Sequence, residues 1–196
     1  MKKGTAGKTI LRKDYTPYPW HLEQASFRFE IGDDETSVFS KVEFASRQDE
    51  AAGGDLVLDG ENIELISVAV DGRRLSPTEY TQTDRQLTVH GLHASGCLEM
   101  ESIIRPRENT ALEGLYVSGD FLLTQCEAEG FRKICYFPDR PDVMTRYDVT
   151  LVADRSRYPV LLSNGNAVES GTLEDGRHWV RWVDPFAKPS YLFALV

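Results

Sequence analysis

The sequence predicts an all-β protein, built as an antiparallel β-sandwich with one short helix. Apolar and polar residues alternate along several stretches, pairs of Asn or Asp with Gly recur between them, and only a short piece near residues 125–137 has a helical pattern. A two-residue period is typical of half-buried strands, and Asn-Gly or Asp-Gly pairs favour tight hairpin turns. Frequent turns between short strands indicate antiparallel sheets packed as a sandwich.

Each predicted strand carries apolar side chains at alternate positions, so that one face turns to the core. The expected strands include residues 26–31, 38–44, 86–90 and 147–151. Their expected core residues are Phe27, Phe29, Ile31, Val38, Val42, Phe44, Leu87, Val89, Tyr147, Val149 and Leu151. The turn pairs that separate strands are Asp59-Gly60, Asp71-Gly72, Asn164-Gly165 and Asp175-Gly176.

The short helix is predicted to begin at a capping box. Thr124-Gln125-Cys126-Glu127 places a hydroxyl and a carboxylate three residues apart, where both can accept from free backbone N–H groups. Behind it, apolar residues recur at three- and four-residue spacing, and prolines then end the pattern. These residues are Phe131, Ile134 and Cys135, followed by Pro138 and Pro141. From this pattern alone, Glu127 is a helix cap and Glu129 a solvent-facing residue.

Composition excludes several classes of protein. The chain has 196 residues and a formal net charge of −9, which argues against binding to nucleic acid phosphates. No segment approaches the roughly 20 apolar residues that span a membrane, so no membrane partner is expected. The three cysteines, Cys97, Cys126 and Cys135, form no CxxC pair. Unpaired, widely spaced cysteines indicate reduced thiols and a cytoplasmic location.

The domain organisation is expected to be simple. Residues 1–14 are basic and polar, without the apolar run of a signal peptide, and we expect them to form a flexible tail. Residues 15–196 are expected to form a single β domain. Residues 191–196 are almost wholly apolar, whereas the end of a domain is normally polar and frayed. We therefore expect this chain to be a fragment of a longer protein.

Neither a metal site nor a nucleophile is predicted. His90 and His93 are three residues apart with no glutamate between them, which does not match the zinc-binding H-E-x-x-H helix. The chain has no G-x-S-x-G elbow and no phosphate-binding loop. Glu127 and Glu129 could act as a carboxylate pair, but glycosidase carboxylates usually come from separate strands or loops.

Two long strings resemble a known family. NTALEGLYVSGDFLLTQCEAEGFRKICYFPDRPDV at residues 109–143 and YPVLLSNGNAVESGTLEDGRHWVRWVDPFAKPSYLFALV at residues 158–196 are similar to the N-terminal domain of bacterial aminopeptidase N. That family consists of gluzincin zinc metallopeptidases of the membrane alanyl aminopeptidase type. The resemblance covers the chain from about residue 15 and is loose over residues 45–108. It implies a saddle-like all-β domain that packs against a separate catalytic domain, expected downstream.

The resemblance also implies a role in binding substrate. The family's zinc-binding H-E-x-x-H and its G-A-M-E-N motif are absent from this chain, so zinc is expected in the intact enzyme but not here. The fragment is expected to lack catalytic residues and to be inactive alone. In the family's T-Q-C-E motif, the Glu accepts the α-ammonium group of a peptide and the Gln lines the pocket for the first side chain. By position, these residues are Glu127 and Gln125.

Two other functions remain open from sequence. The chain could be a free-standing carbohydrate- or protein-binding module, in which Trp20, Trp179 and Trp182 serve as ligand platforms. Large aromatic residues are more often buried in a core or interface, which argues against this role. The chain could also be a hydrolase that uses Glu127 and Glu129.

Overall fold

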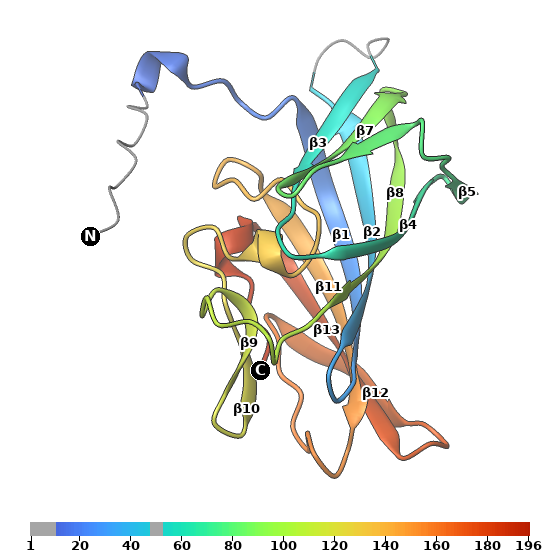
Figure 1. The fold of residues 1–196 in the computed structure, drawn as a ribbon, viewed down its shortest axis with the longest axis vertical. Coiled ribbons are helices and arrows are strands. Elements are labelled where there is room, and N and C mark those ends of the chain that lie inside the picture. The colour runs from blue at the N-terminus through green and yellow to red at the C-terminus, as the bar shows by residue number, and fades with distance from the viewer. Residues whose placement is uncertain (1–10, 48–52) are drawn as a thin grey trace.

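A computed structural model of the protein describes residues 11–47 and 53–196. Within this part, the chain forms three sheets joined by loops and short 3-10 helices (Figure 1). The elements are η1 (Arg12–Asp14), β1 (Trp20–Ile31), β2 (Thr36–Ser46), β3 (Gly54–Asp59), β4 (Glu64–Val70), β5 (Arg73–Arg74), β6 (Tyr80–Gln82), β7 (Gln86–Leu92), β8 (Ser95–Ile104), β9 (Gly114–Ser118), β10 (Phe121–Gln125), η2 (Phe131–Lys133), β11 (Thr145–Asp154), β12 (Asn166–Thr172), β13 (Arg177–Lys188) and η3 (Ser190–Leu192). The all-β prediction is confirmed. Residues 1–10 of the expected basic tail lie outside the described part.

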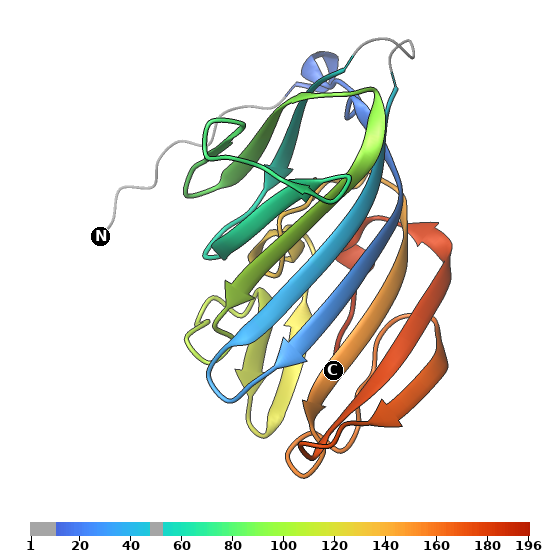
Figure 2. The ribbon, with the colours of Figure 1, turned by 90° about the vertical axis from the view of Figure 1, so that its right-hand side faces the viewer.

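The largest sheet has eight strands in the order β12-β13-β11-β1-β2-β8-β4-β5. Figure 2 shows the long strands of this sheet side by side. The two smaller sheets, β3-β7-β6 and β9-β10, lie on one face of the large sheet (Figure 1). The short helices η2 and η3 lie on the same face. Every pair in the sheets is antiparallel except β1 with β11, which is parallel, with Gln24 opposite Arg146 and Ile31 opposite Ala153. The expectation of purely antiparallel sheets is therefore wrong for this pair.

The core lies between the large sheet and the smaller elements. All the predicted core residues of the four expected strands are buried. Six aromatic rings form one cluster at its centre. They are Phe27, Phe29, Phe131, Phe137, Tyr147 and Phe193. Alternation buries Phe27, Phe29 and Tyr147, because successive residues of a strand point to opposite faces of the sheet, whereas the other three rings come from η2 and from loops.

Three of the four predicted turn pairs form turns or bends. Asp71 and Gly72 join β4 to β5 with φ angles of 51° and 78°, the left-handed backbone that such pairs adopt readily. Gly176, with φ at 87°, lies in the turn between β12 and β13. Asn164-Gly165 forms a bend before β12.

Asp59-Gly60 does not close a hairpin, so that prediction is wrong. Asp59 ends β3, whose partner is β7, and the chain then crosses to the large sheet. Glycine is required here for another reason, because a Cβ on Gly60 would lie 2.2 Å from the ring of Tyr136. Among the described residues, no helix has the length and apolar character needed to cross a membrane.

Candidate functional site

The candidate site is the loop of residues 126–130, which leaves the end of β10 and leads into η2. Strand β10 is fixed on one side by β9, where Gln125 pairs with Gly114. On its other side lies the C-terminal segment. The Thr124 N–H donates to the carbonyl of Leu195 at 3.0 Å, and the Leu195 N–H donates to the Thr124 hydroxyl at 2.8 Å. The loop therefore starts from a strand held on both edges.

These contacts overturn the predicted capping box. The only helical turn between residues 125 and 137 is η2, whose N-cap is Gly130 without a side-chain cap hydrogen bond. Thr124 belongs to β10, and its hydroxyl is already engaged by Leu195. The local pattern was misleading because the partner of Thr124 lies 71 residues further along the chain.

The loop has a compact backbone. The Gly130 N–H donates to the Cys126 carbonyl at 2.8 Å, which closes the loop on itself. A Cβ on Gly130 would lie 2.2 Å from the carbonyl oxygen of Gln125, so only glycine fits. The Gln125 Nε2 donates to the Glu127 carbonyl oxygen at 3.1 Å. The peptide bond between Glu127 and Ala128 is cis.

The structure thus places both predicted site residues close together, with Gln125 exposed at the end of β10 and Glu127 exposed on the adjoining loop. Within the described part of the chain, the Glu127 carboxylate makes no hydrogen bond or ion pair. Glu129 differs, because its carboxylate lies 3.3 Å from Nη2 of Arg132. Glu127 is consequently the carboxylate of this loop that is free to accept a cationic donor.

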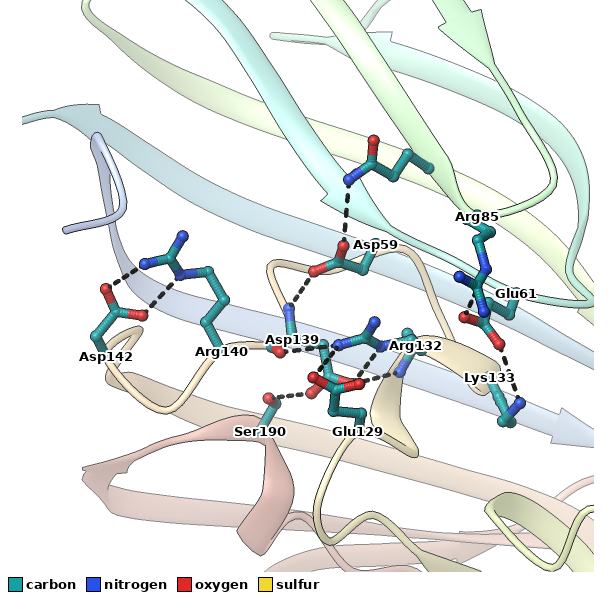
Figure 3. Close-up of polar contacts among 11 residues, drawn as sticks. Asp59, Glu61, Arg85, Glu129, Arg132, Lys133, Asp139, Arg140, Asp142 and Ser190 are labelled. Carbon is teal, nitrogen blue, oxygen red and sulfur yellow. Dashed lines mark hydrogen bonds and ion pairs between the residues drawn. The ribbon is translucent and has the colours of Figure 1, made fainter. Parts of the chain in front are cut away.

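Behind the loop lies a buried polar cluster, which we define as Arg132, Asp139 and Ser190 (Figure 3). The Asp139 side chain is only 1% exposed. Its Oδ2 accepts from the backbone N–H and from Nε of Arg132, both at 3.1 Å, and its Oδ1 accepts from the Ser190 hydroxyl at 2.6 Å. Sequence reasoning missed this cluster. The only signal in the sequence was the position of Asp139 directly after the apolar Phe137-Pro138 pair. That position does not reveal which residues Asp139 contacts.

The cysteines and histidines do not build a second site. Cys126 and Cys135 are buried and unpaired, and burial raises the pKa of both thiols. His90 lies between Asp55 and Thr81, with its ring nitrogens 2.9 and 2.8 Å from their side-chain oxygens. No group of three or more His, Cys, Asp and Glu side chains in residues 11–47 and 53–196 could hold a metal ion. The described residues therefore do not fit a zinc ion, which the resemblance places in a separate catalytic domain.

The tryptophans pack against the chain itself. Trp20 is 3% exposed, and its indole N–H donates to the Asp55 carbonyl at 3.0 Å. The Trp182 indole N–H donates to the Leu161 carbonyl at 3.2 Å. The ring of Trp179 covers Gly171, where a Cβ would lie 2.8 Å from Nε1. This arrangement gives little support to the tryptophans as ligand platforms.

Comparisons with known proteins agree with this architecture. The Peptidase M1 N-terminal domain family matches residues 23–192. Aminopeptidase N of Caulobacter vibrioides is 48% identical over 93% of this chain, and aminopeptidase N of Escherichia coli is 45% identical over 94%. Aminopeptidase N of Haemophilus influenzae is 44% identical over 96% of the chain. The chain spans only 21–22% of the length of these relatives.

Solved structures show the same fold. Legionella pneumophila aminopeptidase A, in complex with aspartic acid, superposes with a TM-score of 0.88 at 34% identity, over 93% of this chain and 22% of that one. An M1 zinc metallopeptidase from Deinococcus radiodurans, bound to a Tyr-Ser-Ala substrate, superposes with a TM-score of 0.77 over 90% of this chain and 42% of that one. At 15% identity the second likeness concerns the fold alone. The family match and the curated relatives confirm the predicted resemblance, and the chain belongs to the Peptidase M1 N-terminal domain family.

Proposed function

We propose that residues 15–196 are the N-terminal domain of a zinc aminopeptidase that removes N-terminal residues from peptides in the cytoplasm. Glu127 binds the α-ammonium group of the substrate, and Gln125 lines the pocket for the first side chain. The observation that carries the proposal is the unpaired, exposed Glu127 carboxylate on a compact loop of a domain whose relatives are aminopeptidases. A catalytic domain that follows this one is the proposed partner and forms the other wall of the site.

The chemistry of an exopeptidase explains why a carboxylate is needed. A free amino terminus differs from an internal peptide bond by one positive charge and by three hydrogen-bond donors. A carboxylate enclosed between two domains accepts from this ammonium through a charge-assisted hydrogen bond, worth about 1.5–3 kcal/mol. An internal amide leaves the enclosed carboxylate unpaired, which adds to the discrimination.

The bond-breaking chemistry is assigned to the proposed partner domain. No group of His, Cys, Asp and Glu side chains among the described residues fits a zinc ion, and the side chains of the partner domain carry out the hydrolysis. Within the chain, Glu127 holds the amine and Gln125 fixes the loop through its bond to the Glu127 carbonyl at 3.1 Å. We expect the isolated domain to be inactive on peptides and on amino-acid amides.

The test is Glu127→Gln in the full-length enzyme, with amino-acid chromogenic amides as substrates. Loss of a hydrogen bond worth 1.5–3 kcal/mol predicts that kcat/KM falls about 10- to 150-fold. Asp120→Asn is the matched control, because it removes one exposed carboxylate from the turn between β9 and β10, the strand that leads into the loop. Unchanged kinetics in Glu127→Gln, or an equal loss in the control, would overturn the proposed role of Glu127.

A further inference from the structure

We propose that Asp139 is a positioning residue for Glu127. Asp139 acts through Arg132: it holds η2, and with it the 126–130 loop, against the C-terminal segment at Ser190. This inference rests on the proposed function of Glu127 and deepens it, because it identifies what fixes the ammonium-binding carboxylate in place.

The contacts of Asp139 join three segments that are far apart in the sequence (Figure 3). Its carboxylate accepts twice from Arg132 and once from Ser190, so η2 and η3 are tied to one buried group. Its backbone N–H donates to Oδ2 of Asp59 at 3.1 Å, which adds the end of β3. A buried carboxylate with this many donors is held firmly, since loss of any partner leaves a charge or donor unsatisfied.

The link from Arg132 to the loop runs through the backbone. The Lys133 N–H donates to the Gly130 carbonyl at 3.0 Å, and the Gly130 N–H donates to the Cys126 carbonyl at 2.8 Å. Because there is no room for a Cβ between Gly130 and Gln125, the start and the end of the loop are in direct contact. A shift of η2 therefore displaces the short segment that carries Glu127.

Arg132 also pairs with one of the two carboxylates of the loop, that of Glu129, and with the buried carboxylate of Asp139. Its side chain is 17% exposed, and its guanidinium contacts buried Asp139 on one side and exposed Glu129 on the other. Asp139 sets where this guanidinium lies, because Nε is bound to the Asp139 carboxylate at 3.1 Å. With Asp139 neutralised, the guanidinium loses its buried counter-charge and is drawn toward the carboxylates of the loop.

The first experiment measures loop order in the 196-residue chain. We expect Asp139→Asn to speed hydrogen exchange of the Gly130 amide by about tenfold or more, because a buried charge pair is broken beside the loop. The matched control is Asp148→Asn, which breaks the contact of Asp148 with Arg181 at 2.6 Å on the opposite face of the large sheet. Unchanged exchange at Gly130, or an equal increase in the control, would overturn the positioning role.

The second experiment is a double-mutant cycle in the full-length enzyme, with Glu127→Gln and Asp139→Asn. Asp139→Asn alone should lower kcat/KM for amino-acid amides by about tenfold or more, mainly through KM, since a small misplacement of a binding group is costly. In the Glu127→Gln background the same change should alter kcat/KM by less than about threefold, because Asp139 acts through Glu127. Equal losses in both backgrounds would assign Asp139 a merely structural role.

The outcomes separate the two proposals. No effect of Glu127→Gln removes the proposed function and this inference together. An effect of Glu127→Gln without one of Asp139→Asn removes only the inference. If Asp139→Asn fails to fold, Ser190→Ala replaces it, because it deletes one hydrogen bond of 2.6 Å and keeps the buried charge pair. The same cycle with Ser190→Ala then decides the matter on the same criteria.

Discussion

Phe131 joins the aromatic core to the 126–130 loop, and Phe131→Ala should be among the most damaging substitutions in this domain. Its ring is fully buried, with centroids of Phe193 at 4.9 Å, Phe137 at 5.3 Å and Phe27 at 5.7 Å. Several of these contacts are edge-to-face or tilted, the arrangements that aromatic pairs prefer.

The expected loss follows from two contributions. Removing a buried Phe side chain forfeits about 1.5–3 kcal/mol of transfer free energy. The cavity adds to this, because the neighbouring rings are large and belong to separate elements that cannot collapse together. We therefore expect the free energy of unfolding to fall by about 3–5 kcal/mol. For a domain of this size, that loss lowers Tm by about 6–20 °C.

The assay is urea denaturation of the 196-residue chain, followed by circular dichroism. Phe186→Ala is the matched control, because the Phe186 side chain is 77% exposed and the same truncation there should change stability by less than about 0.5 kcal/mol. A loss below about 1 kcal/mol in Phe131→Ala, or equal losses in the two variants, would refute the packing argument.

Three further predictions concern the acid stability given by Asp142, the loop residue Gly130 and the proposed ammonium-binding residue Glu127. Hydrogen bonds from Arg140 lower the pKa of Asp142 to about 2, so its ionised form stabilises the fold above the ordinary pKa of 3.8 and this contribution is lost as pH falls toward 2. After allowance for solvent screening, Asp142→Asn should lower the free energy of unfolding by about 1–2 kcal/mol at pH 6 and by little at pH 2. Urea denaturation at each pH measures this difference. Gly130→Ala should cost at least about 1–3 kcal/mol in the same assay, because the added Cβ would meet the Gln125 carbonyl at 2.2 Å. Glu127→Gln should change stability by less than about 0.5 kcal/mol, since its carboxylate has no partner within the described residues.

Each of these predictions has a control or a contradicting result. Asp34→Asn makes the same charge change in an exposed loop, and a pH profile like that of Asp142→Asn would contradict the assignment. Gly119→Ala meets no atom within 4 Å, although its φ of 60° adds some backbone strain, so it should cost less than Gly130→Ala. A loss above about 1 kcal/mol in Glu127→Gln would indicate a structural role for this side chain.

The strands could be predicted because burial of alternate side chains is a local property. Phe27 and Phe29 face the core whichever strands lie beside them, so a two-residue period was enough to identify them. Pairing is not local. Gln24 lies opposite Arg146 in the parallel pair, and the crossover between the two strands contains most of the chain. Such a long connection leaves no trace in the pattern of either strand.

The site could be predicted only in part for the same reason. Thr124 fits a capping box in sequence, but Leu195 takes its hydroxyl in the folded protein. The role expected for Glu127 came from the family resemblance, since its own neighbours indicated a cap. Asp139 and Ser190 meet across 51 residues, and neither belongs to a recognisable motif. Long-range polar contacts are thus the part of this fold that sequence patterns do not reveal.

Under the proposed function, the different environments of Glu127 and Glu129 leave a loop with two nearby carboxylates with a single position for the ammonium group. An ammonium group faced with two free carboxylates would have two ways to bind, and the scissile bond would move with it. A shift of about 1 Å is enough to slow a reaction strongly. Arg132 removes this ambiguity by contacting Glu129 at 3.3 Å, while the Glu127 carboxylate stays unpaired among the described residues. Because Asp139 holds Arg132 from within the core, the proposed function makes a buried residue decide which of the two carboxylates binds the ammonium group.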